Sequence, residues 1–192
     1  YLYAAVNQLD GVEAYAIVTW DLLEDTMISP IPIPHVRPIT SMDVSADNNR
    51  IITASADHSI ILYDLQANTI LRRMLGHRGS VNRVYFGEDD DVALSASDDS
   101  TLILWDLETG QLIRQYTVGN PISGLYLSND HTLAVSTDTT NFVTVWRIES
   151  LDDVVEWVVD NRALLPLTDE QCRQFEIECD GYDGVDDTRT LR

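Results

Sequence analysis

Short stretches of alternating apolar and polar residues, separated by turn residues, make up most of the chain. The segment from Ser80 to Val118 shows the pattern in full, as SVNRVYF, GEDDD, VALSAS, DDS, TLILWDL, ETG and QLIRQYTV in succession. Alternation with a period of two is typical of strands with one buried face, and clusters of Gly, Asp and Ser are typical of turns. The segment is therefore predicted to form four short antiparallel strands.

The same pattern returns with a period in the low forties. Each copy ends on an aromatic residue within an apolar run: AIVTWDL at Trp20, SIILYDL at Tyr63, TLILWDL at Trp105 and FVTVWRI at Trp146. These aromatic residues are 43, 42 and 41 residues apart, in the range of one four-stranded propeller blade. Four short strands cannot bury both of their faces, so each blade must stack on its neighbours. The sequence thus predicts an all-β propeller.

The copy from Gly76 to Asp106 resembles the WD-repeat family, through the pair Gly76-His77 and the run SASDDSTLILWD. The resemblance implies a structural hydrogen-bond network in each of two copies. Its members are His77, Ser95, Asp99 and Trp105 in this copy, and His35, Thr53, Asp57 and Tyr63 in the copy before it. The last copy departs from the pattern, because Asn120 replaces the histidine and Thr140 the aspartate, while Ser136 and Trp146 are kept. We expect that last blade to be held more by packing than by the network.

A histidine, a serine and an aspartate in one blade also raise the alternative of a hydrolase triad, because such triads are recognised by geometry and not by order in the chain. A nucleophilic serine needs an exposed turn and an oxyanion hole, whereas Ser95 lies in an alternating strand. Buried polar groups that need hydrogen-bond partners explain the set without chemistry. We therefore expect no catalytic residue, no metal and no cofactor in this chain.

The expected architecture is about three and a half blades of a seven-bladed WD-repeat propeller, followed by a short α-helical C-terminal tail. The predicted propeller region is 1–149, with a partial blade at 1–34 and blades at about 35–76, 77–119 and 120–149; a helical extension at 150–179 and a flexible acidic tail at 180–192 follow it. One helical face carries Leu151, Val154, Val155 and Val158, after Ser150 and Asp153 in capping-box positions. We expect this helix to pack on the last blade.

The predicted ring is incomplete. Propellers close with four to eight blades, and these residues supply three recognisable repeats and the end of a fourth. The last copy passes from NFVTVWRIE directly into the helical pattern, without a fourth strand. We expect missing N-terminal blades to close the ring and to supply that strand. In the earliest blade NQLDGVEA replaces a tight turn, which predicts a longer hairpin, either a tolerated insertion or a binding loop.

Charge and composition exclude some partners. The chain has 32 acidic residues against 12 basic ones, all arginine, and a formal net charge of −20, which repels phosphate backbones and argues against nucleic-acid binding. It lacks both the run of roughly 18 to 20 apolar residues of a membrane span and a signal-peptide pattern, so we expect no membrane partner and a cytoplasmic location. The two cysteines, Cys172 and Cys179, are expected to be reduced and buried. The acids near the C-terminus lack the spacing of a calcium loop.

These features predict a non-catalytic scaffold for protein–protein interaction, with other proteins or an upstream domain of the same polypeptide as partners. The alternative is the sensor region of a larger bacterial signalling or defence enzyme, with an NTPase, kinase or protease-like effector domain upstream. The tail around Trp157, Asn161-Arg162 and Leu167-Thr168 resembles the tail of bacterial multidomain WD-repeat proteins, which keeps this alternative open.

The preferred binding surface is, by analogy with WD-repeat proteins, the top face, formed by the loops that enter each blade and by the turns between its second and third strands. It is expected to display Arg37, His58, Arg78, Asn82 and Asp98. The opposite face is expected to be acidic, through Glu88, Asp89, Asp90, Asp91 and Glu108. Because a cluster of like charges is usually solvated surface, the top face is the candidate site.

Overall fold

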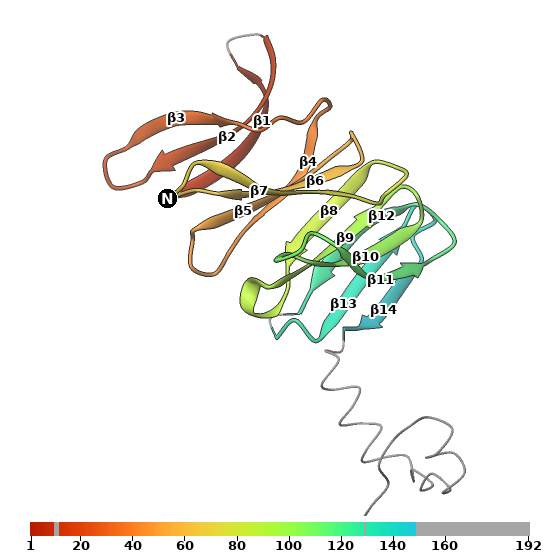
Figure 1. The fold of residues 1–192 in the computed structure, drawn as a ribbon. Helices are drawn as coiled ribbons and strands as arrows, with labels where there is room; N and C mark the ends of the chain where they lie inside the picture. The colour runs from red at the N-terminus through yellow and green to blue at the C-terminus, as the bar shows by residue number, and fades with distance from the viewer. Residues whose placement is uncertain (10–11, 129, 149–192) are drawn as a thin grey trace, which may run out of the picture. The chain divides into compact units, whose positions relative to one another are not determined.

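Four antiparallel β-sheets follow one another along the chain in the computed structural model, which describes residues 1–9, 12–128 and 130–148 (Figure 1). The chain divides into two units, Tyr1–Ile148 and Glu149–Arg192. The predicted helix, the acidic tail and both cysteines lie outside the described residues. No helix among the described residues is long and apolar enough to cross a membrane.

Each sheet is one blade, and the strands in it are neighbours in sequence order. Blade 1 consists of β1 (Leu2–Leu9), β2 (Val12–Asp21) and β3 (Thr26–Pro32). Blade 2 consists of β4 (Ile39–Val44), β5 (Arg50–Ser55), β6 (Ser59–Asp64) and β7 (Thr69–Leu75). Blade 3 consists of β8 (Val81–Phe86), β9 (Val92–Ser97), β10 (Thr101–Asp106) and β11 (Leu112–Thr117), with a 3₁₀ turn at Glu88–Asp90. Blade 4 consists of β12 (Ile122–Leu127), β13 (Leu133–Asp138) and β14 (Val143–Arg147). The predicted all-β class and the four-stranded blades are confirmed.

The two end blades are shorter than the two central ones. The aromatic repeat positions Trp20 and Trp146 lie in β2 and β14, as Tyr63 and Trp105 lie in the third strands β6 and β10. Blade 1 therefore corresponds to the second, third and fourth strands of a blade, and blade 4 to the first three. The hairpin of β1 and β2 is also extended, because these strands have 8 and 10 residues where β5 and β6 have 6 each.

Alternating residues of a central strand supply two different cores. In β10, Ile103 and Trp105 point toward blade 2, whereas Leu102 and Leu104 point toward blade 4. Both faces of the strand are buried between sheets, which explains why the run TLILWDL is apolar at almost every position although its side chains alternate in direction.

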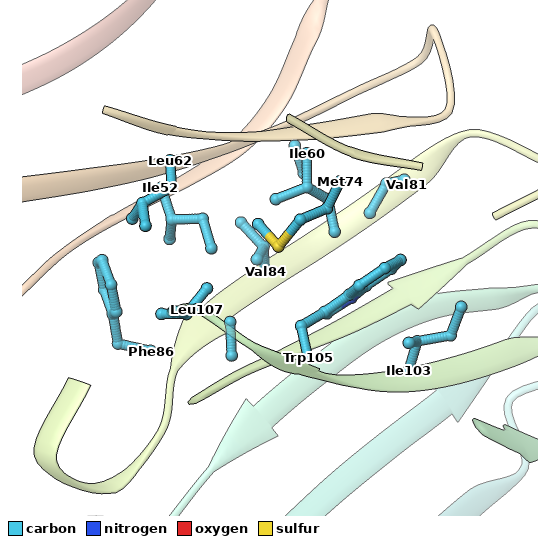
Figure 2. Close-up of a cluster of buried hydrophobic side chains, with 12 residues drawn as sticks. Ile52, Ile60, Leu62, Met74, Val81, Val84, Phe86, Ile103, Trp105 and Leu107 are labelled. Atoms are coloured by element: carbon cyan, nitrogen blue, oxygen red, sulfur yellow. The ribbon is translucent and has the colours of Figure 1, made fainter. Parts of the chain in front are cut away.

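The core between blades 2 and 3 is the largest cluster of buried apolar side chains described (Figure 2). Blade 2 contributes Ile52, Ala54, Ile60, Leu62 and Met74, and blade 3 contributes Val81, Val84, Phe86, Ala93, Ile103, Trp105 and Leu107. Complete burial of one large apolar side chain stabilises a fold by roughly 1.5 to 3 kcal/mol. The face-to-face packing of these two sheets thus provides much of the stability that holds their connecting loops in place.

Hydrogen bonds from backbone N–H groups to side-chain oxygens also join neighbouring blades. Phe86 N donates to Asp43 Oδ2 at 2.9 Å and Ala46 N donates to Asp90 Oδ2 at 2.8 Å, both between blades 2 and 3. Ile39 N in blade 2 donates to Asn7 Oδ1 in blade 1 at 2.8 Å. These bonds give backbone groups at the blade boundaries a partner that no strand pairing supplies, so they fix the register of one blade against the next.

Candidate functional site

Four side chains of blade 3 form one buried hydrogen-bonded chain. His77, in the loop before β8, has Nδ1 3.1 Å from Asp99 Oδ2 and Nε2 2.7 Å from Ser95 Oγ. Trp105 Nε1 donates to the same Ser95 Oγ at 2.8 Å. The structure therefore brings together all four residues that the sequence grouped in this copy. Because the Asp99 carboxylate can only accept, the Nδ1 proton of His77 donates to it; Nε2 of the neutral ring then accepts from the Ser95 hydroxyl.

Thr101 also belongs to this network, and the sequence analysis missed it. Thr101 Oγ1 lies 3.1 Å from His77 Nδ1 and donates to Asp99 Oδ1 at 2.6 Å. Asp99 accepts two further bonds, from Arg78 N at 2.7 Å and from Thr101 N at 3.0 Å. An aspartate followed two residues later by Ser or Thr is a turn pattern with its own hydrogen bonds, so Asp99-Ser100-Thr101 carried a signal that turn chemistry could have revealed.

Blade 2 has the same arrangement with one exception. His35 Nε2 lies 3.0 Å from Thr53 Oγ1, and its Nδ1 lies 3.1 Å from both Asp57 Oδ2 and Ser59 Oγ. Tyr63 was predicted to join them and does not, because its hydroxyl donates to the Asn68 side chain in the turn between β6 and β7. A phenol carries its donor at the far end of the ring, whereas an indole carries it beside the ring junction. The tyrosine hydroxyl therefore reaches past Thr53 to the next turn.

Blade 4 has a polar network that the sequence comparison did not reveal. Asn120 Nδ2 donates to Asp138 Oδ2 at 2.9 Å, and Asp138 Oδ1 accepts from Thr140 N at 2.8 Å and from Thr140 Oγ1 at 2.7 Å. Trp146 Nε1 donates to Ser136 Oγ at 2.8 Å, as Trp105 does to Ser95. The expectation that packing outweighs hydrogen bonding in this blade overlooked Asp138, two residues before Thr140.

Burial and hydrogen bonding set the charges in these networks. Burial lowers the pKa of His35 and of His77 more than the neighbouring aspartate raises it, so both imidazoles are neutral at pH 7. Burial acts in the opposite direction on the pKa of Asp57, but the hydrogen bonds from Ser59 Oγ and from the backbone of Val36 and Ser59 outweigh it and lower the pKa to about 2. The pKa of Asp99 is lowered in the same way. Each network is thus a neutral histidine donating to a carboxylate.

The stability of the protein is expected to fall in two steps as the pH is lowered. A histidine with a lowered pKa binds fewer protons folded than unfolded, so its contribution is complete above the unfolded pKa of about 6.5 and declines below it. Asp57 adds a second decline between about 4 and about 2, as the pH falls toward its folded pKa. Urea unfolding from pH 7.5 to pH 2 measures both steps. His77→Gln should flatten the first step, and a slope equal to that of the unaltered protein would contradict the assignment.

These buried groups are not arranged for hydrolysis. Ser95 Oγ belongs to a fully buried residue and already has Trp105 Nε1 and His77 Nε2 as partners, so no substrate carbonyl can reach it. Within residues 1–9, 12–128 and 130–148, no group of three or more His, Cys, Asp or Glu side chains is placed to hold a metal ion. The arrangement of His77, Ser95 and Asp99 serves instead to tie the loop before β8 to the turn between β9 and β10.

The predicted top-face residues lie at one end of blades 2 and 3, which we call the loop end. It consists of the loops before β4 and β8 and of the turns between β5 and β6 and between β9 and β10. Arg37, His58, Arg78 and Asp98 are exposed there. Asn82 differs, because it is half-buried in β8 and its Nδ2 donates to Asp98 Oδ1 at 2.6 Å and to Ile122 O of blade 4 at 2.7 Å. Asn82 thus joins two blades and holds Asp98, and it has less freedom to contact a partner than the sequence suggested.

The acidic residues predicted at the opposite end differ in burial and in their contacts. Asp89 and Asp91 are exposed, in agreement with a solvated acidic surface. Asp90 is buried and accepts the hydrogen bond from Ala46 N, so it is a contact between blades 2 and 3 and not part of that surface. The backbone carbonyl of Glu108 accepts from Arg72 Nε at 2.8 Å, which joins the same two blades.

Two four-stranded antiparallel sheets stack face to face, and each holds a histidine–aspartate pair between an entering loop and a turn. This arrangement is typical of the blades of a β-propeller. The family model described as WD domain, G-beta repeat matches residues 30–64 and 68–106, which contain both histidine networks. Residues 30–106 therefore consist of WD repeats, which supports a WD-repeat β-propeller family for this part of the chain. A search of the curated proteins gave no match. WD repeats form protein-interaction modules, and propeller domains of this family are in general non-catalytic.

Proposed function

We propose that the chain is a non-catalytic scaffold for protein–protein interaction and that its partner binds the loop end of blades 2 and 3. The observation that carries this proposal is the way in which the two buried aspartates hold the loops. Asp57 Oδ2 accepts from Val36 N at 2.9 Å, and Asp99 Oδ2 accepts from Arg78 N at 2.7 Å. Each carboxylate lies in a turn and fixes the backbone of the loop that enters the same blade.

Loops fixed in this way present their side chains at little entropic cost on binding. Arg37 O accepts from Ser55 Oγ at 3.0 Å and Pro38 O accepts from Ala56 N at 3.0 Å, so the loop before β4 is held along its length. A rigid loop loses less conformational freedom when a partner binds than a mobile one does. Exposed side chains on rigid supports are the usual composition of a binding surface.

We also infer that additional propeller blades contact the outer faces of blades 1 and 4 in the complete assembly. Trp20 supports this inference, because it is 37% exposed at a repeat position where Tyr63 and Trp105 are 6% and 2% exposed. Burial of an aromatic side chain of that size is strongly favourable. The number of blades in the closed ring, seven by our sequence analysis, remains a prediction.

Capture of binding proteins with charge-reversed variants tests the proposed surface. The full chain is immobilised and exposed to an extract of its source cells, beside the double variant Arg37→Glu/Arg78→Glu and the control double variant Asp89→Arg/Asp91→Arg. Proteins bound through the loop end should be reduced at least about tenfold with the first variant and retained with the second. Retention by the first variant together with loss from the second would place the binding surface at the opposite end and overturn the proposal. Melting temperatures of all three proteins establish that they remain folded.

A further inference from the structure

Exposed charge at the loop end of blade 2 is positive, although the chain as a whole carries −20. Arg37, Arg73 and Arg78 are all exposed around the turn from Ala56 to His58, and we call these three residues the cationic rim. Arg73, in β7, is the member that the sequence analysis missed. Its Nη2 lies 3.5 Å from Asp57 Oδ2 and 3.3 Å from Ser59 Oγ.

The other members of the rim are placed beside the same turn by backbone contacts. Arg37 and Pro38 both accept hydrogen bonds from residues 55 and 56, where the turn begins. Strand β7 ends at Leu75, which pairs with Ser59 at the end of the turn, so the loop that carries Arg78 begins beside it. The loops before β4 and β8 therefore both run beside the turn of blade 2, and each contributes one arginine.

Asp57 forms an ion pair with Arg73, but the two network aspartates at this end are largely buried and leave the guanidinium groups of Arg37 and Arg78 exposed. The Asp57 side chain is 3% exposed and the Asp99 side chain 12% exposed, and each accepts hydrogen bonds from a histidine, a hydroxyl and backbone N–H groups. The exposed Asp98 is bound by Asn82. A partner that approaches the rim therefore meets guanidinium groups first, and at close range a local charge outweighs a distant net charge, since the Debye length is about 8 Å at physiological ionic strength.

An apolar side chain lies within the rim. Val36 is 74% exposed, stands between His35 and Arg37 in the chain, and has its backbone N–H held by Asp57 Oδ2. An exposed valine on a fixed backbone offers an apolar contact that a bare cluster of charges lacks. The surface thus combines carboxylate-binding groups with one apolar anchor.

We propose that the cationic rim binds a short acidic peptide segment, with Asp or Glu carboxylates on Arg37, Arg73 and Arg78 and an apolar side chain on Val36. The proposal rests on the loop-end surface proposed above and names the chemistry of its partner. Arginine suits this role, because its planar guanidinium forms paired hydrogen bonds with a carboxylate. A nucleic acid is a poorer fit, because it extends well beyond the rim and meets the excess negative charge of the rest of the protein.

Fluorescence anisotropy with labelled peptides tests the proposal on the full chain. The probes are a peptide of Asp, Glu and Leu, the same peptide with Asn and Gln in place of the acids, a basic counterpart, and a single-stranded oligonucleotide of matched length. We expect the acidic peptide to bind, to weaken as salt is raised, and to exceed each other probe at least about tenfold in affinity. Equal binding of the amide peptide, or tighter binding of the oligonucleotide, would overturn the proposal.

Two matched variants distinguish binding at the rim from a general effect of the net charge. Arg78→Glu should weaken binding of the acidic peptide at least about tenfold, whereas Arg114→Glu, an identical change at an exposed position of β11, should change it less than about twofold. Equal losses in the two variants would show that only net charge matters and would contradict a defined site. If the loop end captures cellular proteins but no acidic peptide binds, the proposed surface is supported and the acidic class of partner is wrong. If capture does not change in the Arg37→Glu/Arg78→Glu variant, the proposed surface itself is wrong.

Discussion

Replacing Trp105 with alanine is expected to lower the free energy of unfolding by about 3 to 5 kcal/mol. The indole is 2% exposed within the core between blades 2 and 3, and its N–H donates to Ser95 Oγ at 2.8 Å. It also meets the His77 ring edge-on, with centroids 6.1 Å apart. A Cβ atom at Gly76 would lie 2.8 Å from Trp105 Cη2, so the loop backbone rests directly against the ring. The variant would leave a cavity in the core shown in Figure 2. It would also remove one of the hydrogen-bond partners of Ser95 Oγ, which keeps His77 Nε2.

Trp20→Ala is the matched control, because it removes the same side chain from the same position of the repeat in blade 1. Trp20 is 37% exposed and its Nε1 donates to the exposed Asp25 side chain, so the expected loss is below about 1.5 kcal/mol. Urea unfolding at a dilution where both variants are monomeric measures the difference. Similar losses would show that burial between blades is not what makes Trp105 important.

The periodicity of the sequence predicted the blades, because strands that are buried between two sheets require apolar residues at regular positions. Strands β8, β9, β10 and β11 lie within the four alternating stretches of the segment from Ser80 to Val118. The alternation does not determine which side chain completes a polar network, because this depends on how far the donor or acceptor atom lies from the backbone. Tyr63 shows the difference, since it fills the aromatic position of the core and sends its hydroxyl elsewhere.

The turns between second and third strands show why Asp138 was missed. His58, Ser100 and Asn141 occupy the same turn position in blades 2, 3 and 4, with φ of 70°, 68° and 63°. The backbone of the turn is thus the same, while the carboxylate moves from its third position, Asp99, to its first, Asp138. Comparison by position found no aspartate at Thr140, although the first position of the same turn also places an acceptor within reach of the loop.

The aromatic repeat residues of blades 2, 3 and 4 each pack against the preceding blade, and Trp20 of blade 1 has no described blade in that position. Tyr63 of blade 2 lies in a core with Ile17 and Ile33 of blade 1. Trp105 of blade 3 lies in a core with residues of blade 2, and the Trp146 ring is 5.4 Å from the Tyr116 ring of blade 3. Trp20 points toward the position of a blade before blade 1.

Blade 4 exposes the face that, in the central blades, packs against the aromatic residue of the next blade. Trp146 and its strand partner Ala134 face blade 3, so alternation directs Val143 and Val145 of β14 to the other face. Val145 is 62% exposed, and Val143 and Tyr126 are exposed with it. In the central blades the corresponding face is covered by the next blade. Within the described part of the chain, blade 1 and blade 4 therefore each leave one such surface exposed, and the two surfaces are complementary in type.

We expect the isolated chain to associate head to tail through these two surfaces, the outer face of blade 4 in one copy against the outer face of blade 1 in the next. Such contacts join different surfaces and so allow closed rings or growing chains. Val145→Asp places a charge in the contact and should weaken association at least about tenfold. Val36→Asp, the same change at an exposed valine of the loop end, should leave it unchanged. Sedimentation velocity over a wide range of concentrations measures both.

A mixture of two variants distinguishes a head-to-tail contact from non-specific aggregation. Trp20→Asp blocks the surface on blade 1 and Val145→Asp blocks the surface on blade 4, so each variant alone has no complementary pair and should sediment as a monomer. Mixed in equal amounts, the intact blade 4 surface of the first variant meets the intact blade 1 surface of the second, and a heterodimer should form. A monomeric unaltered chain, or a mixture that stays monomeric while the unaltered chain associates, would show that the two faces are not partners.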